Sequence, residues 1–235
     1  MVKFKYYSLA EAHQAKGVTV VIDVLRAFTT AAFAFERGVE KILPVSSVAE
    51  AVALKKTVPN SLIMGEVNGF KPERFDFSNS PNLIARADIN GKTLIQRTSA
   101  GTQGLVKAEY ATHLAAASFV VANATAKWLQ LMEPEQISFI ITGDSLGRDG
   151  DEDRACAEYI AALVQGRAPD PAEFTRRIMT SSVGESFLSG KTNYLLKDDL
   201  LMSAQTDIFD FALSVSREEG HLVMRKFVDF NVPHE

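Results

Sequence analysis

Residues 18–27 read Val18-Thr19-Val20-Val21-Ile22-Asp23-Val24-Leu25-Arg26-Ala27, and they set the architecture of the chain. The β-branched run over 18–24 is typical of a strand covered on both faces, as in a parallel sheet. Residues 28–38 follow with many alanines and a helical spacing of aromatic side chains, and they end at a glycine, as a helix does. A buried strand followed at once by a helix predicts the α/β class.

The same alternation continues along the chain. Ser47 is expected to cap a helix that ends near Lys56, with Glu50 completing a capping-box pattern. Further strands are expected at 41–45, 62–64, 92–97, 119–121 and 137–141, further helices at 98–105, 123–132 and 152–164, and a terminal strand at 222–227. Helices dominate from Pro169 up to that last strand. The pattern predicts a mostly parallel, mixed sheet between helices, in one domain spanning residues 1–235.

Composition excludes several classes of protein. A 235-residue chain with 46% hydrophobic and 23% charged residues is typical of a soluble globular protein. Its formal net charge of −4 gives no electrostatic reason to expect a nucleic-acid partner. Its single cysteine, Cys156, excludes an internal disulfide and is expected to be buried. We expect no membrane partner and a cytoplasmic location, since the chain shows neither a signal peptide nor a long apolar run.

The loop over residues 65–81 combines glycine, proline and asparagine, and it follows the expected strand at 62–64. Such a composition favours an ordered, turn-rich loop. Long ordered loops often carry function. Glu66, Asp76 and Asn79 in this loop could place oxygens around a hard cation or a polar substrate. The alternative is a packed structural loop with solvated acids.

A second candidate site is the turn over residues 97–104. Its glycines let backbone N–H groups approach an anion, its hydroxyls add donors, and a helix follows. The candidate substrate-binding residues are therefore Thr98, Ser99, Gly101 and Thr102, together with Asn79 and with Asn123 at a further strand end. The turn lacks the Gly-Lys-Ser/Thr of a Walker A loop. A simple helix cap is the alternative.

Charged residues near the first strand suggest catalysis. Arg26 would oppose the dipole of the helix that it begins, so it needs an anionic partner. Asp23 lies in an apolar strand, where a carboxylate is costly unless it is paired or metal-bound. Asp23, Glu66, Asp76, Glu152 and Asp153 supply the oxygen ligands that Mg²⁺ prefers, whereas the four histidines show no zinc-ligand spacing.

Four segments, taken in order, resemble the signatures of the 2-phosphosulfolactate phosphatase family. They are residues 20–27, the loop with Gly65-Glu66, Gly69, Lys71-Pro72, Phe75-Asp76 and Asn79-Ser80-Pro81, the turn 98–102, and Glu152-Asp153 with Cys156-Ala157. Weaker agreement occurs at Asp198-Asp199-Leu200 and at Asp207. The chain departs from the family at Ala100, where the family usually has asparagine, and at Val67-Asn68. These departures bear on sulfonate specificity.

The resemblance implies a three-layer α/β/α fold and a Mg²⁺-dependent phosphatase. The implied reaction hydrolyses 2-phospho-3-sulfolactate to sulfolactate and phosphate, a step of coenzyme M biosynthesis. Asp23, Arg26, Glu66 and Asp153 are then the expected catalytic residues, and Asp23, Glu66 and Asp153 the expected metal ligands. The partner is a small anionic molecule, and a homo-oligomer stays open.

Two alternatives stay open beside it: a phosphatase of a different small phospho-acid, and a non-catalytic protein that binds a small phospho- or sulfo-anion. Haloacid-dehalogenase phosphatases match poorly, because they need Asp-x-Asp where this chain has Asp23-Val24-Leu25.

Overall fold

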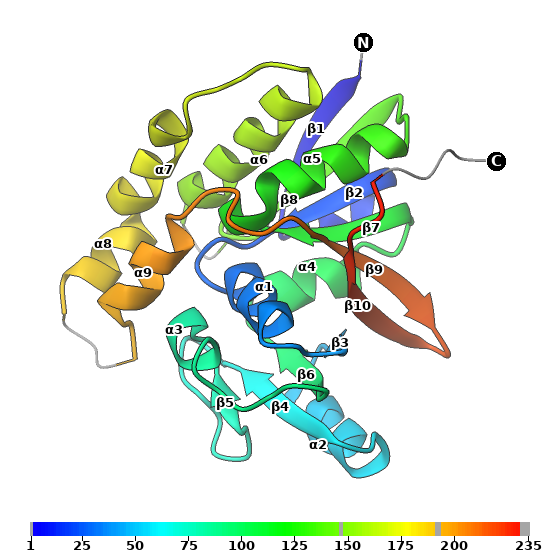
Figure 1. The fold of residues 1–235 in the computed structure, drawn as a ribbon, viewed down its shortest axis with the longest axis vertical. Helices are drawn as coiled ribbons and strands as arrows, with labels where there is room; N and C mark the ends of the chain where they lie inside the picture. Colours follow the sequence, from blue (N-terminus) through cyan, green and yellow to red (C-terminus); the bar gives the residue numbers. More distant parts are fainter. Residues whose placement is uncertain (1, 146–147, 191–193, 231–235) are drawn as a thin grey trace.

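The computed structural model describes residues 2–145, 148–190 and 194–230. Within these residues one ten-stranded sheet has the order β1-β8-β2-β7-β9-β10-β3-β6-β4-β5, with helices around it (Figure 1). The strands are β1 (Lys3–Ser8), β2 (Gly17–Ile22), β3 (Lys41–Pro44), β4 (Ser61–Gly65), β5 (Phe77–Ser78), β6 (Thr93–Arg97), β7 (Ala111–Ala117), β8 (Gln136–Ile141), β9 (Ala212–Glu218) and β10 (His221–Phe227). The mostly parallel, mixed sheet confirms the predicted α/β class.

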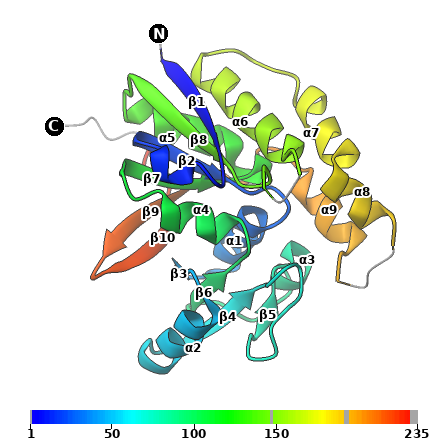
Figure 2. The ribbon, with the colours of Figure 1, turned by 180° about the vertical axis from the view of Figure 1, so that it is seen from behind.

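The helices are α1 (Ala27–Glu36), α2 (Val48–Thr57), α3 (Pro81–Ile84), α4 (Gly101–Lys107), α5 (Ala122–Leu131), α6 (Asp151–Val164), α7 (Pro171–Thr180), α8 (Ser182–Leu188) and α9 (Lys197–Ser203). Helices α5 and α6 cover one face of the β1-β8-β2-β7 group, and α4 lies on the opposite face (Figures 1 and 2). Ser47 caps α2 as predicted, by accepting from the Glu50 N–H at 3.1 Å. The Glu50 carboxylate binds Ser46 instead of completing the box on Ser47.

The strand predicted at 119–121 is wrong. These residues form a short 3-10 helix, and the strand is β7, just before them. The carbonyls of Phe119 and Val120 accept hydrogen bonds from the N–H groups of Asp207 and Phe209, which cross over them. The alanine-rich β7 has little intrinsic strand propensity, so its place in the sheet depends on its neighbours. Strands β1 and β9 were also not predicted.

The sheet contains two parallel groups, β1-β8-β2-β7 and β3-β6-β4-β5, which the antiparallel hairpin β9-β10 joins. Three antiparallel pairings separate the groups, so they run in opposite directions along the sheet. The twist that accumulates over the intervening strands nevertheless brings the carboxyl ends of β2 and β6 together. The Gln96 side chain, on β6, donates to the carbonyl of Ala27 at 2.9 Å. A methyl group on Gly104 of α4 would come within 2.6 Å of Val21 on β2.

Helix α1 fills the space where the two groups meet. Its residues Ala27, Phe28, Ala31, Ala32 and Phe35 are all fully buried. Small alanines let the helix pass close to the strands, and the two phenylalanines fill the remaining volume. No helix of the described residues is long and apolar enough to cross a membrane.

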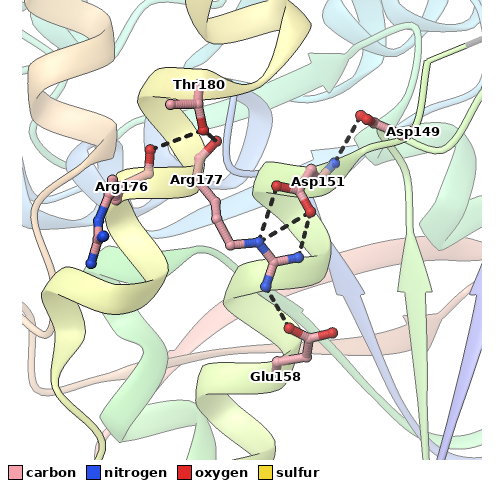
Figure 3. Close-up of polar contacts among 6 residues, drawn as sticks. All are labelled: Asp149, Asp151, Glu158, Arg176, Arg177 and Thr180. Atoms are coloured by element: carbon pink, nitrogen blue, oxygen red, sulfur yellow. Dashed lines mark hydrogen bonds and ion pairs between the residues drawn. The ribbon is translucent and has the colours of Figure 1, made fainter.

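Arg177 on helix α7 forms ion pairs with two carboxylates of helix α6. Figure 3 shows the guanidinium of Arg177 between the carboxylates of Asp151 and Glu158, while the side chain of Arg176 points away from them. Arg177 Nε bonds both oxygens of Asp151, and its Nη1 donates to Glu158. One planar fork therefore joins two carboxylates of α6, a better geometry than a single surface ion pair provides.

We expect Arg177→Gln to lower the free energy of unfolding by about 1 kcal/mol, because these partly exposed pairs are screened by solvent. The loss should shrink in high salt. Chemical denaturation at two ionic strengths measures it, with the exposed neighbour Arg176→Gln as a control that should change stability by less than about 0.5 kcal/mol. Equal effects of the two substitutions would contradict the assignment.

Candidate active site

A pocket of about 530 Å³ opens where β2, β4 and β6 end. Its lining residues are Asp23, Leu25, Arg26, Glu66, Asn68, Gly69, Asn79, Ser99, Ala100, Arg148, Ser182, Val183, Ser186, Phe187, Tyr194 and Leu195. The polar side chains come mainly from the strand ends, and the apolar ones mainly from α8 and the residues before α9. The pocket therefore has a charged part at the strand ends, with Asp23, Arg26 and Glu66, which we call the floor. Its apolar part, with Val183, Phe187 and Leu195, we call the wall.

Asp23 lies directly after β2, not within the strand as the sequence suggested. Its buried carboxylate accepts a hydrogen bond from the backbone N–H group of Ala27 at 2.9 Å. A methyl group on Gly101 would come within 2.7 Å of both Asp23 and Ala27, so only glycine fits there. Burial, together with the nearby carboxylates of Glu66 and Glu152, raises the pKa of Asp23 to about 6, against the lowering effect of the hydrogen bond from Ala27.

Glu66 follows β4 and faces the same pocket. The backbone N–H groups of Ser99 and Gly69 each donate to its carboxylate at 2.6 Å, and the Ser99 hydroxyl donates at 3.1 Å. This network ties the loop after β4 to the turn after β6. The predicted loop site and the predicted turn thus meet at one carboxylate.

In the turn over residues 98–102, the hydroxyls of Thr98 and Thr102 accept hydrogen bonds from backbone N–H groups of the same turn. Thr98 Oγ1 accepts from the Thr102 N–H at 3.0 Å, and Thr102 Oγ1 accepts from the Thr98 N–H at 2.8 Å. The backbone of Gly101, which the sequence assigned to a substrate anion, lies against the Asp23 carboxylate instead. The N–H groups of Thr98, Ser99 and Thr102 are therefore engaged inside the protein, so three of the four predicted donors are not free to bind an anion in this structure. Ser99 and Ala100 are the residues of this turn that line the pocket.

Arg26 finds its anionic partner in a side chain that the sequence analysis did not assign to it. Its Nη1 forms an ion pair with Asp199 Oδ2 at 2.6 Å and donates to the Tyr194 carbonyl at 3.2 Å. The guanidinium lies 5.2 Å from the ring centre of Phe187. Among the described residues, no acceptor bonds its Nε or Nη2. Since Arg26 lines the pocket, these two groups are available to an anion there.

Asn79 presents an unsatisfied acceptor. Its side chain is 4% exposed and lines the pocket, yet its Oδ1 has no hydrogen-bond partner in the described part of the chain. Buried polar atoms nearly always have a partner, so this unpaired oxygen, on a residue that lines the pocket, is a candidate contact for a bound ligand. Asn79 was predicted to bind substrate, and the structure brings it to the same pocket as Asp23, Arg26 and Glu66.

Asp153 does not line the pocket. It is buried, and its Oδ1 accepts from the Val24 N–H at 2.7 Å, while its Oδ2 accepts from Gly143 N–H at 2.8 Å and from Thr142 Oγ1 at 3.2 Å. Burial raises its pKa well above the usual range, and the charges of Glu152 and Asp23 act in the same direction. Asp153 therefore holds the loops after β2 and β8.

Two other expected residues lie elsewhere. Asn123 is exposed, and its N–H donates to Asp207 Oδ1 at 2.6 Å, at the start of α5. Asp76 accepts from Lys55 and from the Ile63 N–H, so it ties the loop to α2 and β4. Neither residue lines the pocket.

Cys156 is fully buried as predicted, and burial raises the pKa of its thiol well above the usual range. It has no access to the pocket.

The sequence analysis did not assign Arg148, Phe187, Tyr194 or Leu195 to the site. Arg148 reaches the pocket from the segment between β8 and α6, and the other three line it from α8 and the residues before α9. No local motif marks them. Asp199, the partner of Arg26, was the one residue of this region with a signal in the sequence, namely the weak family resemblance at residues 198–200.

A family model described as 2-phosphosulpholactate phosphatase matches residues 5–217, which include every residue of the pocket. The chain belongs to this family. It is 34% identical over 214 residues to a Bacillus subtilis protein named "Probable 2-phosphosulfolactate phosphatase", with 91% of each chain covered. Relatives of the same name occur in Carboxydothermus hydrogenoformans, at 34% identity over 87% of this chain and 89% of the relative, and in Clostridium perfringens, at 31% over 89% and 90%. Membership of the family makes this protein a phosphoric monoester hydrolase.

We expect Asp23→Asn to lower turnover by about tenfold to a hundredfold, the scale of losing a charge that acts on the reacting group. The substitution should also change how stability depends on pH. Asp23 binds its proton more tightly in the folded protein, where its pKa is about 6, than in the unfolded chain, where it is near 3.8. Its contribution to stability therefore falls, by about 3 kcal/mol at most, as the pH rises from about 4 to 6.

The measurement is denaturation of both proteins across this pH range in chelator. The stability of Asp23→Asn relative to the wild type should rise with pH. Asp210→Asn, which removes an exposed acid, should show no such trend. A flat difference for Asp23→Asn would contradict the raised pKa.

Proposed function

We propose that this protein is a Mg²⁺-dependent phosphatase that hydrolyses 2-phospho-3-sulfolactate to sulfolactate and phosphate, the reaction of coenzyme M biosynthesis. The observation that carries the proposal is the unpaired Oδ1 of Asn79, buried in a pocket that also holds Arg26, Asp23 and Glu66. The names of the relatives supply the substrate. The pocket contains charged and polar side chains that could bind this substrate.

Arg26 is the donor that best fits the transferring phosphoryl group. A guanidinium presents a planar set of N–H donors that matches phosphate oxygens. Among the described residues, Asp199 and Tyr194 bond only Nη1, which leaves Nε and Nη2 for such contacts. The apolar wall of Leu25, Val183 and Phe187 reduces water around the guanidinium, which strengthens its attraction for an anion.

Asp23 and Glu66 are the carboxylates that would hold Mg²⁺. No three His, Cys, Asp or Glu side chains of the described residues are grouped closely enough to hold a metal ion together. Mg²⁺ commonly uses only one or two protein carboxylates, with waters and substrate phosphate as its other ligands, so two pocket-facing acids fit it. When bound, the ion would neutralise charge on the phosphoryl oxygens.

Asn79 and Glu66 then have separate roles. The Asn79 Oδ1 is an acceptor, so it would take a hydrogen bond from a hydroxyl of the substrate or from the attacking water. Glu66 is held by three donors on the loop and the turn, so its carboxylate keeps a fixed direction toward the pocket. Fixed charges of this kind need little reorganisation during the reaction.

A phosphatase of a different small phospho-acid is the second candidate. Ala100 favours it, because this residue lines the pocket where relatives usually carry an asparagine amide. A methyl group in place of an amide removes polar contacts with a substrate. Comparing kcat/KM for 2-phospho-3-sulfolactate with values for phospholactate and an aryl phosphate separates the two candidates.

We expect phosphatase activity to require Mg²⁺ or Mn²⁺. Exhaustive chelation should abolish turnover of 2-phospho-3-sulfolactate, and added Mg²⁺ should restore it, whereas Zn²⁺ should not, since the pocket offers oxygen ligands. Phosphate release measures the reaction. Full activity in chelator would refute the metal requirement, and binding without turnover in Mg²⁺ would favour the non-catalytic alternative.

Asn79→Ala should lower kcat/KM by about tenfold to a hundredfold, because the variant loses a contact in the pocket. Its free energy of unfolding should change little, since the substitution also removes an unsatisfied buried acceptor. Steady-state kinetics and thermal unfolding test both parts. Asn123→Ala is the matched control, and it should keep normal kinetics if that residue lies outside the site. Normal kinetics for Asn79→Ala would remove Asn79 from the site.

A further inference from the structure

Asp199 is a buried carboxylate that joins the C-terminal helices to the pocket. It lies on α9 and is 0% exposed. Its Oδ2 pairs with Arg26 Nη1 at 2.6 Å, and its Oδ1 accepts from Ser80 Oγ at 2.7 Å and from the Asn82 N–H at 3.1 Å. A buried charge is tolerated when it is paired and hydrogen-bonded in this way. Three donors from two other segments fix its position.

The two oxygens of Asp199 serve two parts of the pocket. Oδ2 holds Arg26, and Oδ1 holds the first turn of α3, which begins directly after Asn79. Ser80 Oγ also caps α3 by accepting from the Leu83 N–H at 3.3 Å. One carboxylate thus fixes the arginine and the backbone beside the asparagine.

Asp199 determines which donors Arg26 has left. A guanidinium is planar. Contacts that fix one of its nitrogens and the orientation of its plane therefore also fix the directions in which its other N–H groups point. Asp199 and the Tyr194 carbonyl hold Nη1, and the Phe187 ring lies 5.2 Å from the guanidinium carbon. Nε and Nη2 then stay available to the pocket.

We propose that Asp199 is a positioning residue, which orients Arg26 toward the anionic group of the substrate without contacting the substrate itself. Asp199 is absent from the pocket lining, so it acts through the residues that it holds, and Arg26 is the lining residue with which it pairs directly. The inference rests on the proposed function, since it needs Arg26 to bind the substrate anion.

The substitution Asp199→Asn is expected to act mainly on Arg26. The amide oxygen is best placed at the Oδ1 position, where it keeps the two hydrogen bonds from Ser80 and Asn82. The amide nitrogen then faces Arg26 Nη1, and two donors oppose each other. The variant therefore keeps the contact with α3 and releases the guanidinium.

Kinetics on 2-phospho-3-sulfolactate, or on an aryl phosphate if the former is not turned over, test the proposal. Asp199→Asn should lower kcat/KM by about tenfold to a hundredfold, with most of the change in KM, the scale expected for outer partners of site residues. Asp198→Asn is the matched control, because Asp198 is the exposed neighbour on the same helix, and it should behave as wild type. Wild-type kinetics for Asp199→Asn would overturn the proposal.

A double-mutant cycle separates positioning from a general structural role. In an Arg26→Gln background, Asp199→Asn should change kcat/KM by less than about threefold, since the residue it orients is already gone. An equal loss in both backgrounds would show that Asp199 acts independently of Arg26 and would overturn the proposal. Affinity for inorganic phosphate, measured by calorimetry, should show the same non-additivity. That measurement needs no turnover, so a protein that binds phosphate but hydrolyses nothing refutes the proposed function alone.

Asp199→Glu covers the case in which the asparagine variant does not fold. It keeps the negative charge but moves the carboxylate by one methylene, which should displace Arg26. A kcat/KM at least about tenfold below wild type, with a cooperative thermal transition, supports positioning. Unchanged kcat/KM in the folded glutamate variant contradicts it.

Discussion

The contact between Asp23 and Gly101 is the constraint on which the pocket depends. Two groups of parallel strands run in opposite directions through one sheet. Within the described part of this sheet, the hairpin β9-β10 lies between the two groups and joins them. The sheet twist brings the carboxyl ends of β2 and β6 together, and α1 and α4 pack tightly where the groups converge. At this point the backbone of Gly101 lies against the Asp23 carboxylate, with no room for a methyl group. This close approach joins the two halves at the pocket, beside the carboxylate of Asp23.

Several buried carboxylates lie in the pocket or behind its lining, and backbone N–H groups stabilise most of them. Asp23, Glu66 and Asp153 each accept from backbone N–H groups of a neighbouring loop or helix start. Neutral donors hold a carboxylate in place without cancelling its charge. Asp23 and Asp153 therefore keep raised pKa values, because burial and mutual repulsion still disfavour their charged forms. Such groups are suited to binding a cation or a proton near neutral pH.

The C-terminal helices complete the site from the other side. Helix α7 is held on α6 by Arg177, α8 contributes Phe187 to the apolar wall, and α9 contributes Asp199. Asp199 differs from the other buried acids because it is paired with a cation. That pairing satisfies one edge of the Arg26 guanidinium and leaves the other edge to the pocket. The ion pair between Arg26 and Asp199 thus links the charged floor of the pocket to the C-terminal helices that form its apolar wall.

Local patterns in the sequence determined the α/β class and most of the elements. The β-branched run before Asp23, the cap at Ser47 and the alternation up to α6 are short-range signals that need no tertiary information. The same signals, with the family resemblance, singled out Asp23, Arg26, Glu66 and Asn79, which all line one pocket. Strand β7 was missed, because its alanines pair in the sheet only through their neighbours.

Only the tertiary structure decided the partners of these residues. The backbone of Gly101 lies against a protein carboxylate, Asp153 holds two loops away from the lining, and Asn123 lies outside the pocket. Arg26 pairs with a residue 173 positions along the chain. Separations of this length leave no periodic or compositional trace, because they depend on how the sheet twists and where the last helices pack.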